Sequence, residues 1–223
     1  MMSQRSTKDV SDPLVSTFCF APGVGLGTER NLWSSGIVHW DHVHPDGVGC
    51  LGAKRIAALR SAIDRARQDL EAGRPDFVRD GLGNAETWRA YPRYRTRAVY
   101  LDIETTGLFS WDKVTLIGMY DGEALTILER GKNLNEFPRL IRNYSLIVSF
   151  NGRSFDVPFL QREFPKLRLH QAHWDLRWAF HALGRAGSLK HIERDFGLVR
   201  EGALAGLSVP IAEEWDEIRS ELM

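Results

Sequence analysis

The stretch that decides the fold is Ala98-Val99-Tyr100-Leu101-Asp102-Ile103-Glu104-Thr105-Thr106-Gly107. Its apolar beginning is typical of a buried β-strand. Side chains alternate between the two faces of a strand, so Asp102 and Glu104 lie on one face, opposite to the apolar residues beside them. Two neighbouring carboxylates repel each other unless a cation lies between them, and magnesium prefers carboxylate oxygens. The stretch therefore predicts a divalent-metal site at the end of a strand.

The composition is that of an ordinary globular protein. The 223 residues are enough for one sizeable domain, or for one domain and a small companion. The formal net charge of zero gives no general basic signature for nucleic acid. Cys19 and Cys50 are the only cysteines, too few for a disulfide framework, so we expect a cytoplasmic location. The polar N-terminus indicates no signal peptide, and we expect no membrane partner because no apolar run is long enough to span a bilayer.

The N-terminal region, residues 1–97, is expected to be small and helical. Apolar residues recur at helical spacing over Ala53–Ala72, which predicts a helix. Upstream, Pro22–Gly27 contains three glycines before a shorter helix. For this helix Thr28 is the expected N-cap and Gly36 the residue after the end.

The three glycines of this turn, Gly23, Gly25 and Gly27, have two interpretations. A Pro-Gly-Val-Gly turn before a short helix resembles the helix-hairpin-helix element of DNA-repair and nuclease proteins. In that element, backbone N–H groups can approach a phosphate at a helix N-terminus. The alternative is a structural turn in a small helical domain.

Residues 73–97 are expected to connect the N-terminal region to the domain that begins at Ala98. Trp88–Arg97 interleaves arginines with aromatic residues, the combination that lines grooves for single-stranded nucleic acid. Arg93 and Arg95 are therefore candidate contacts to a nucleic-acid backbone. The alternative is a docking linker whose aromatic side chains pack on the next domain.

From Ala98 onward the pattern is that of an α/β domain over residues 98–223. Strands are predicted over Ala98–Glu104, Lys113–Tyr120, Ala124–Leu128, Leu146–Phe150 and Leu167–Leu169. Asp121-Gly122 predicts an antiparallel hairpin between the second and third strands. Helices are predicted over Leu134–Asn143, Ser154–Phe164, Asp175–Leu183 and Ser188–Phe196, and from Ile211 onward.

A second chemical motif is Phe150-Asn151-Gly152-Arg153-Ser154-Phe155-Asp156, in which a strand turns into a helix with Asp156 in the first turn. Alone, such an Asp often only complements the helix dipole. Together with Asp102 and Glu104, however, it resembles the DEDD 3′–5′ exonucleases of the ribonuclease H-like superfamily. Leu101–Gly107 is similar to their first motif and Phe150–Asp156 to their second. The chain as a whole is most similar to the bacterial YprB-type branch.

The resemblance implies an α/β fold with a ribonuclease H-like mixed sheet flanked by helices, its first three strands antiparallel. It also implies a nuclease that cuts DNA or RNA with two divalent ions, Mg²⁺ or Mn²⁺. Asp102, Glu104 and Asp156 would be the catalytic and metal-binding residues. The partner would be nucleic acid with a single-stranded 3′ end, and nothing in the sequence indicates a protein partner. The residues implied to hold the substrate are Thr105, Thr106, Gly107, Leu108, Asn151 and Ser154.

One part of the family pattern is missing. The family has a fourth carboxylate, preceded by a His or Tyr general base, beyond the helix that Ser188–Phe196 resembles. The sequence up to Met223 contains no His-Asn-x-x-Asp segment there, and His170 and Asp175 have a similar spacing but precede that helix. The acidic residues beyond the second motif that lie in no motif are Asp195, Glu213, Glu214 and Asp216.

This departure leaves three alternatives. The chain is a shortened form of an active enzyme, or it recruits another carboxylate, or it binds nucleic acid with impaired catalysis. The choice matters for turnover, because general acid–base catalysis alone typically contributes about 10²–10⁴-fold to a rate.

Overall fold

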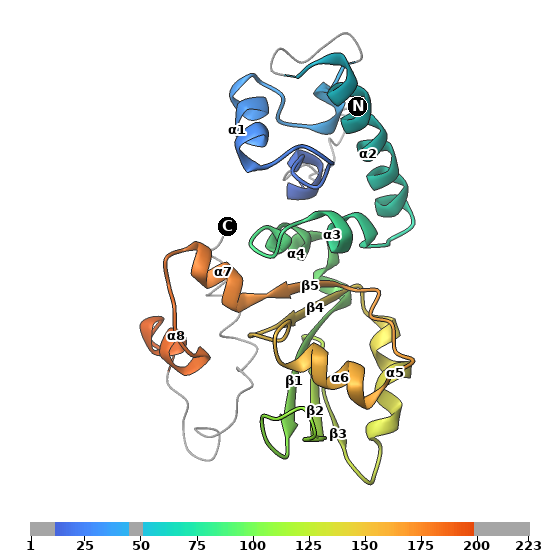
Figure 1. Ribbon diagram of the computed structural model, residues 1–223, viewed down its shortest axis with the longest axis vertical. Helices are drawn as coiled ribbons and strands as arrows, with labels where there is room; N and C mark the ends of the chain where they lie inside the picture. The colour runs from blue at the N-terminus through green and yellow to red at the C-terminus, as the bar shows by residue number, and fades with distance from the viewer. Residues whose placement is uncertain (1–11, 45–50, 199–223) are drawn as a thin grey trace, which may run out of the picture.

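The computed structural model describes residues 12–44 and 51–198, in which a helical N-terminal part precedes an α/β part (Figure 1). Elements labelled η are short 3₁₀ turns. The N-terminal elements are η1 (Pro13–Ser16), α1 (Leu26–Ser34), η2 (Trp40–His42), α2 (Ala53–Glu71), α3 (Asp76–Gly81), η3 (Thr87–Ala90), α4 (Tyr91–Tyr94) and η4 (Arg95–Arg97). The α/β elements are β1 (Ala98–Thr105), β2 (Val114–Tyr120), β3 (Leu125–Glu129), η5 (Leu134–Glu136), α5 (Phe137–Leu140), η6 (Ile141–Asn143), β4 (Leu146–Ser149), α6 (Asp156–Glu163), β5 (Ala172–Asp175), α7 (Leu176–Ala182) and α8 (Leu189–Asp195).

The five strands form one mixed sheet in the order β3-β2-β1-β4-β5. The first three strands are antiparallel neighbours, and Gly122 in the β2–β3 turn has a φ of +99°, which favours glycine. β4 runs parallel to both β1 and β5, so these three strands end at the same edge of the sheet. The predicted fold class, a mixed sheet flanked by helices with antiparallel first strands, is confirmed.

The two faces of the sheet belong to two different cores. Leu146 and Val148 of β4 pack in a cluster that also contains the apolar residues of the N-terminal helices. Ile147, between them, faces the opposite way and packs in the cluster beneath α5 and α6. Figure 1 shows α3 and α4 between the N-terminal end of the molecule and β5. The N-terminal part therefore covers one face of the sheet, and the division into domains at residues 97 and 98 stays a prediction.

The structure corrects two predictions near the end of the sheet. Residues 167–169 form no strand, and the last strand among the described residues is β5, which begins at Ala172. Asp175, predicted to begin a helix, ends this strand and accepts a hydrogen bond from the backbone N–H of Arg177 as the N-cap of α7. All four residues of β5 are buried, so its sequence lacks the alternation that marks a strand with one face in solvent.

Three helix predictions also change. α1 begins at Leu26 with Gly25 as its N-cap, so Thr28 lies inside the helix, whereas Gly36 follows its end at a φ of +82° as predicted. The helix predicted over 134–143 is divided into η5, α5 and η6, and the connector over 73–97 contains α3. The helix predicted from Ile211 onward lies outside the described residues. No helix in the described parts of the chain has both the length and the apolar character needed to cross a membrane.

Candidate active site

The first motif and the second motif meet in one cleft at the edge where the parallel strands end. The cleft has a volume of about 710 Å³. It brings together all three predicted catalytic carboxylates and four of the predicted substrate contacts. Thr106 and Ser154 are not among the residues that line it. The predicted residues that line the cleft are Asp102, Glu104, Thr105, Gly107, Leu108, Asn151 and Asp156.

β1 presents the first two carboxylates as its sequence pattern predicts. Leu101 and Ile103 are buried, whereas Asp102 is half-buried and Glu104 is exposed. The pairing of β1 with β2 shifts register between Glu104 and Thr105, and such irregularities often redirect side chains at the end of a strand. Because side chains alternate between the two faces of β1, Asp102 and Glu104 both project from the face that borders the cleft.

The second motif is a tight turn between β4 and α6. Asn151 has a φ of +64°, an uncommon conformation for a residue with a side chain. At Gly152, a Cβ atom would lie 2.2 Å from Ser149 Oγ and 3.2 Å from Asp156 Oδ2. Only glycine therefore fits at this position, and its absent side chain lets the turn approach the Asp156 carboxylate.

Asp175 holds this turn in place from the neighbouring strand. Its carboxylate accepts hydrogen bonds from the backbone N–H groups of Asn151 (2.7 Å) and Arg153 (3.0 Å). The side chain of Asp175 is fully buried, and it also caps α7. Sequence reasoning assigned Asp175 no role in the site, because the pattern there predicts only the beginning of a helix.

Asp156 is the electrostatically unusual residue of the cleft. Its side chain is 3% exposed, and its Oδ1 atom has no hydrogen-bond partner among the described residues. Burial, followed by repulsion from the Asp102 carboxylate, raises the pKa of Asp156 to about 8. Without a cation, Asp156 is therefore mostly protonated at neutral pH.

The residues of the cleft fit a divalent ion that keeps water or phosphate oxygens among its ligands. The described residues contain no group of three or more His, Cys, Asp or Glu side chains arranged to hold a metal by themselves. Magnesium in phosphate-binding sites usually takes only one or two carboxylates, with water and phosphate completing its shell. A cation beside Asp102 and Asp156 would give the orphaned Oδ1 a partner and remove the repulsion that raises the pKa.

A loop of exposed aromatic residues borders the cleft. Leu108 is 80% exposed, Phe109 62% and Trp111 73%, and the last two rings stack at a centroid distance of 4.7 Å. Asp112 fixes the loop by accepting hydrogen bonds from Thr106 Oγ1 (2.9 Å) and from the backbone N–H of Phe109 (2.8 Å). Thr106, predicted to touch substrate, thus supports the loop that carries these aromatic rings.

The predicted nucleic-acid contacts of the N-terminal part do not line this cleft. Gly23 precedes α1, Gly25 caps it and Gly27 lies in its first turn, and no heavy atom lies within 4 Å of where a Cβ would be at these three glycines. Arg93 and Arg95 are both exposed. Arg93 donates a hydrogen bond to the Leu70 carbonyl and forms an ion pair with Asp12. Their contact with nucleic acid stays a prediction.

The aromatic residues of the connector pack inside the protein. Tyr91 shares a hydrogen bond of 2.7 Å with Tyr100 of β1 and lies against Trp174 of β5, with ring centroids 5.3 Å apart. Tyr94 donates to the Arg74 carbonyl. These contacts favour the docking-linker interpretation of this segment.

The fourth carboxylate of the family pattern has no counterpart among the described residues that line the cleft. Asp195 lies on α8, where it faces His191 at 3.8 Å. The other acidic candidates, Glu213, Glu214 and Asp216, lie outside the described residues.

Comparison with known proteins identifies a family and several solved structures with a similar fold. A search of curated proteins gives no match. Among solved structures, the crystal structure of the Aedes aegypti Nibbler EXO domain matches with 15% sequence identity and a TM-score of 0.34. That match covers 45% of this chain and 53% of the other, so the chain spans about half the length of the structure, and the likeness is too weak to bear on function. The family model of the RNase_H superfamily matches residues 99–217, more than half of the 223 residues, and the chain therefore belongs to the RNase_H superfamily.

Proposed function

We propose that this chain is a divalent-metal-dependent nuclease of the DEDD type that hydrolyses phosphodiester bonds of DNA or RNA from a single-stranded 3′ end. One observation carries the proposal: Asp156 is buried beside Asp102 in an open cleft, with an unpartnered oxygen and a raised pKa. A buried carboxylate next to another carboxylate is costly unless a cation joins them. Membership of the RNase_H superfamily and the two sequence motifs support a nucleic-acid substrate.

In this proposal Asp102, Glu104 and Asp156 hold Mg²⁺ or Mn²⁺, two ions being the number that the sequence motifs imply. When bound, the metal would stabilise the negative charge that develops on the phosphodiester during hydrolysis. The other residues of the cleft position the substrate. Asn151 lies in the turn that Asp175 fixes, so its position is set before substrate binds.

The aromatic loop supports a single-stranded substrate. Phe109 and Trp111 form a stacked pair that is mostly exposed, and Leu108 continues from this pair into the cleft. Exposed aromatic rings on a fixed loop offer a surface on which an unpaired base can stack, as in other single-strand binding sites. A duplex would have to be unpaired before its bases could use this surface.

The test is cleavage of an oligonucleotide labelled at its 5′ end, with Mg²⁺ or Mn²⁺ and with EDTA as control. The isosteric variant Asp156→Asn is compared with Asp64→Asn, which changes an exposed Asp on α2 in the same way. We expect metal-dependent shortening from the 3′ end by the wild type and by Asp64→Asn. Asp156→Asn should be slower by about 10²-fold or more, the scale seen when transition-state charge stabilisation is removed. Equal rates for the wild type and Asp156→Asn, or cleavage in EDTA, contradict the proposal.

A second candidate function is nucleic-acid binding with impaired catalysis. It is favoured by the cleft itself, which has three carboxylates among its described lining residues and no fourth. It predicts salt-dependent binding without shortening of the oligonucleotide, weakened by Arg93→Gln with Arg95→Gln. Product formation by the wild type removes this candidate, and absence of binding at low salt removes both.

A further inference from the structure

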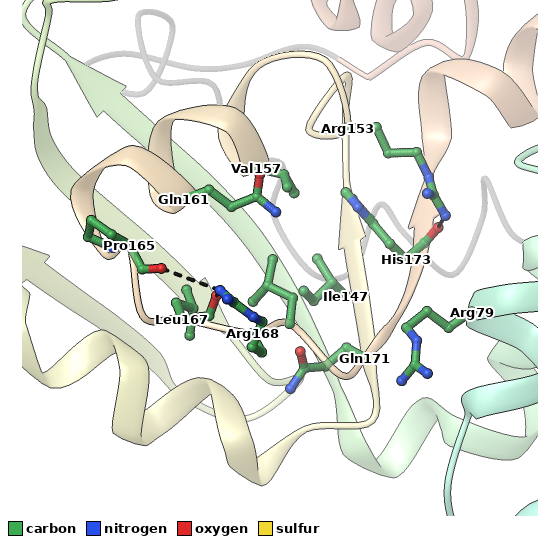
Figure 2. Close-up of a pocket in the computed structure, with 11 residues that line it drawn as sticks. Arg79, Ile147, Arg153, Val157, Gln161, Pro165, Leu167, Arg168, Gln171 and His173 are labelled. Atoms are coloured by element: carbon green, nitrogen blue, oxygen red, sulfur yellow. Dashed lines mark hydrogen bonds between the residues drawn. The ribbon is translucent and has the colours of Figure 1, made fainter.

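A second cavity, of about 590 Å³, is lined in part by Arg153 of the second-motif turn (Figure 2). Three arginines from three different segments line it: Arg79 of α3, Arg153 of the turn, and Arg168 of the segment after α6. No carboxylate is found among its described lining residues. Figure 2 shows Arg79 and Arg168 on either side of Ile147 and Gln171, with Arg153 beside His173. The cavity is therefore basic and only partly enclosed.

In two of the three guanidinium groups, the hydrogen-bond partners do not cancel the positive charge. Arg153 donates through Nη2 to the His173 carbonyl at 2.7 Å, and Arg168 donates to the carbonyls of Pro165 and Leu167. Carbonyl oxygens satisfy hydrogen bonds but do not neutralise a charge. Burial lowers the pKa of Arg153, and the Asp175 carboxylate behind the turn offsets this only in part.

The other polar groups of the cavity add little charge. Arg79 is paired with Asp76 and Asp80 outside the lining. Burial lowers the pKa of His173 to about 3, so its imidazole is neutral at physiological pH. The net charge of the cavity therefore depends on Arg153 and Arg168.

Two residues that line this cavity each have a buried atom without a hydrogen-bond partner among the described residues: Nε of Arg153 and Oε1 of Gln171. Gln171 is 5% exposed, and its Nε2 donates to the Ile141 carbonyl at 2.8 Å, which fixes the orientation of the amide. Buried polar groups without partners are rare in folded proteins and call for an explanation. A ligand that satisfies both atoms must offer an anionic oxygen to the arginine and an O–H or N–H group to the glutamine.

We propose that this cavity binds a small phosphate monoester of nucleotide size. The phosphate would take hydrogen bonds from Arg153 and Arg168, because guanidinium groups match the geometry of phosphate oxygens. A hydroxyl or amino group of the same molecule would donate to Gln171 Oε1. The apolar wall, which includes Ile147 and Leu167, would contact its sugar or base. The cavity volume lies within the range of known small-molecule sites.

The second-motif turn contributes residues to both the cavity and the cleft. Arg153 lines the cavity and Asn151 lines the cleft, two residues apart in the same turn. In α6, Val157 lines the cavity next to Asp156, which lines the cleft. A ligand in the cavity therefore stabilises a turn that also forms part of the cleft, although the cavity itself requires neither metal nor cleavage.

The test is isothermal titration calorimetry of the full chain in EDTA, so that the metal site does not contribute. The probes are inorganic phosphate, adenosine 5′-monophosphate and a short oligodeoxynucleotide. The variants are Arg168→Gln, which changes an exposed side chain, and Arg153→Gln. The matched control is Arg139→Gln on α5, whose side chain is 70% exposed and lies outside the lining of the cavity. Circular dichroism checks that each variant is folded.

We expect at least one probe to bind the wild type, and each cavity variant to bind it about tenfold more weakly, the effect of losing one charge-assisted hydrogen bond. Arg139→Gln should bind like the wild type. Preference for adenosine 5′-monophosphate over inorganic phosphate identifies a free nucleotide as the source of the phosphate, whereas preference for the oligonucleotide, whose phosphates are diesters, overturns the proposal. No binding of any probe, equal weakening by Arg139→Gln, or unchanged binding by both Arg153→Gln and Arg168→Gln overturns the proposal. A failure of the nuclease assay leaves this result unaffected.

Discussion

Replacing Asp156 by Asn is expected to stabilise the metal-free protein at pH 8 but not at pH values below about 4. In the folded protein Asp156 has a pKa of about 8, against 3.8 for an ordinary Asp. Between these values the folded state keeps a proton that the unfolded chain releases. The free energy of unfolding therefore falls as the pH rises, by up to about 1.4 kcal/mol for each pH unit. Asn has the same shape and carries no charge, so the variant lacks this loss.

Buried His173 changes the pH dependence of the free energy of unfolding in the opposite direction, at lower pH. Burial lowers the pKa of His173 from 6.5 to about 3, so the unfolded chain binds the extra proton and stability rises as the pH increases toward 6.5. The two effects oppose each other below pH 6.5. Between pH 6.5 and pH 8 only Asp156, of these two residues, changes its protonation on unfolding. Over this range the free energy of unfolding of the wild type should fall by roughly 1–2 kcal/mol.

The assay is urea denaturation followed by tryptophan fluorescence, in EDTA, at several pH values across this window. Asp156→Asn should show a flat profile, and the control Asp64→Asn should follow the wild type. Adding Mg²⁺ at the upper end of the window should restore stability to the wild type and not to Asp156→Asn, because a ligand that binds the folded state stabilises it. Parallel profiles for the wild type and Asp156→Asn in this window would refute the assignment of a buried, raised-pKa carboxylate.

Three further predictions concern the surroundings of the cleft and the N-terminal core. Asp175→Asn removes the charged acceptor that fixes the second-motif turn, so the free energy of unfolding should fall by about 2 kcal/mol in urea denaturation; an unchanged midpoint contradicts this. Changing Phe109 and Trp111 together to Ala should raise KM for an oligonucleotide by about tenfold or more, as loss of base stacking predicts. Cleavage of a small chromogenic phosphodiester should stay the same, and equal effects on both substrates argue against stacking. In the N-terminal core, the buried Glu29 carboxylate pairs with Arg89 at 2.9 Å. Glu29→Ala removes this anionic partner and should lower the free energy of unfolding by about 3 kcal/mol; a loss within experimental error rules out a structural role for the pair.

The sequence predicted the carboxylate cluster because its members are governed by local rules. The alternation of β1 fixes the face of Asp102 and Glu104, and a strand followed directly by a helix fixes where Asp156 lies. Parallel strands that end at one edge then bring the two motifs together. Each step needs only the period of the pattern and the order of the elements.

The residues that support the cluster could not be predicted in this way. The sequence pattern does not reveal β5, because its polar residues are satisfied by distant partners. His173 Nε2 lies 2.7 Å from Ser149 Oγ, and Asp175 binds the turn after β4. These contacts connect residues more than twenty positions apart in the sequence, so no local pattern shows that a His or an Asp there is buried. The N-cap of α1 escapes prediction for a simpler reason, since Gly25 caps the helix without a side-chain signal.

The N-terminal helices share a core with the sheet, and this shared core limits where the chain can be cut into stable fragments. Trp174 of β5 packs on Tyr91, and β5 is an edge strand that contacts α3 and η3. A fragment beginning at Ala98 would uncover the apolar face around Leu146 and Val148 and leave the edge of β5 open to pairing with other chains. Such a fragment should aggregate although it carries every carboxylate of the cleft. A fusion protein meant to transplant the cleft therefore has to include the N-terminal helices as well.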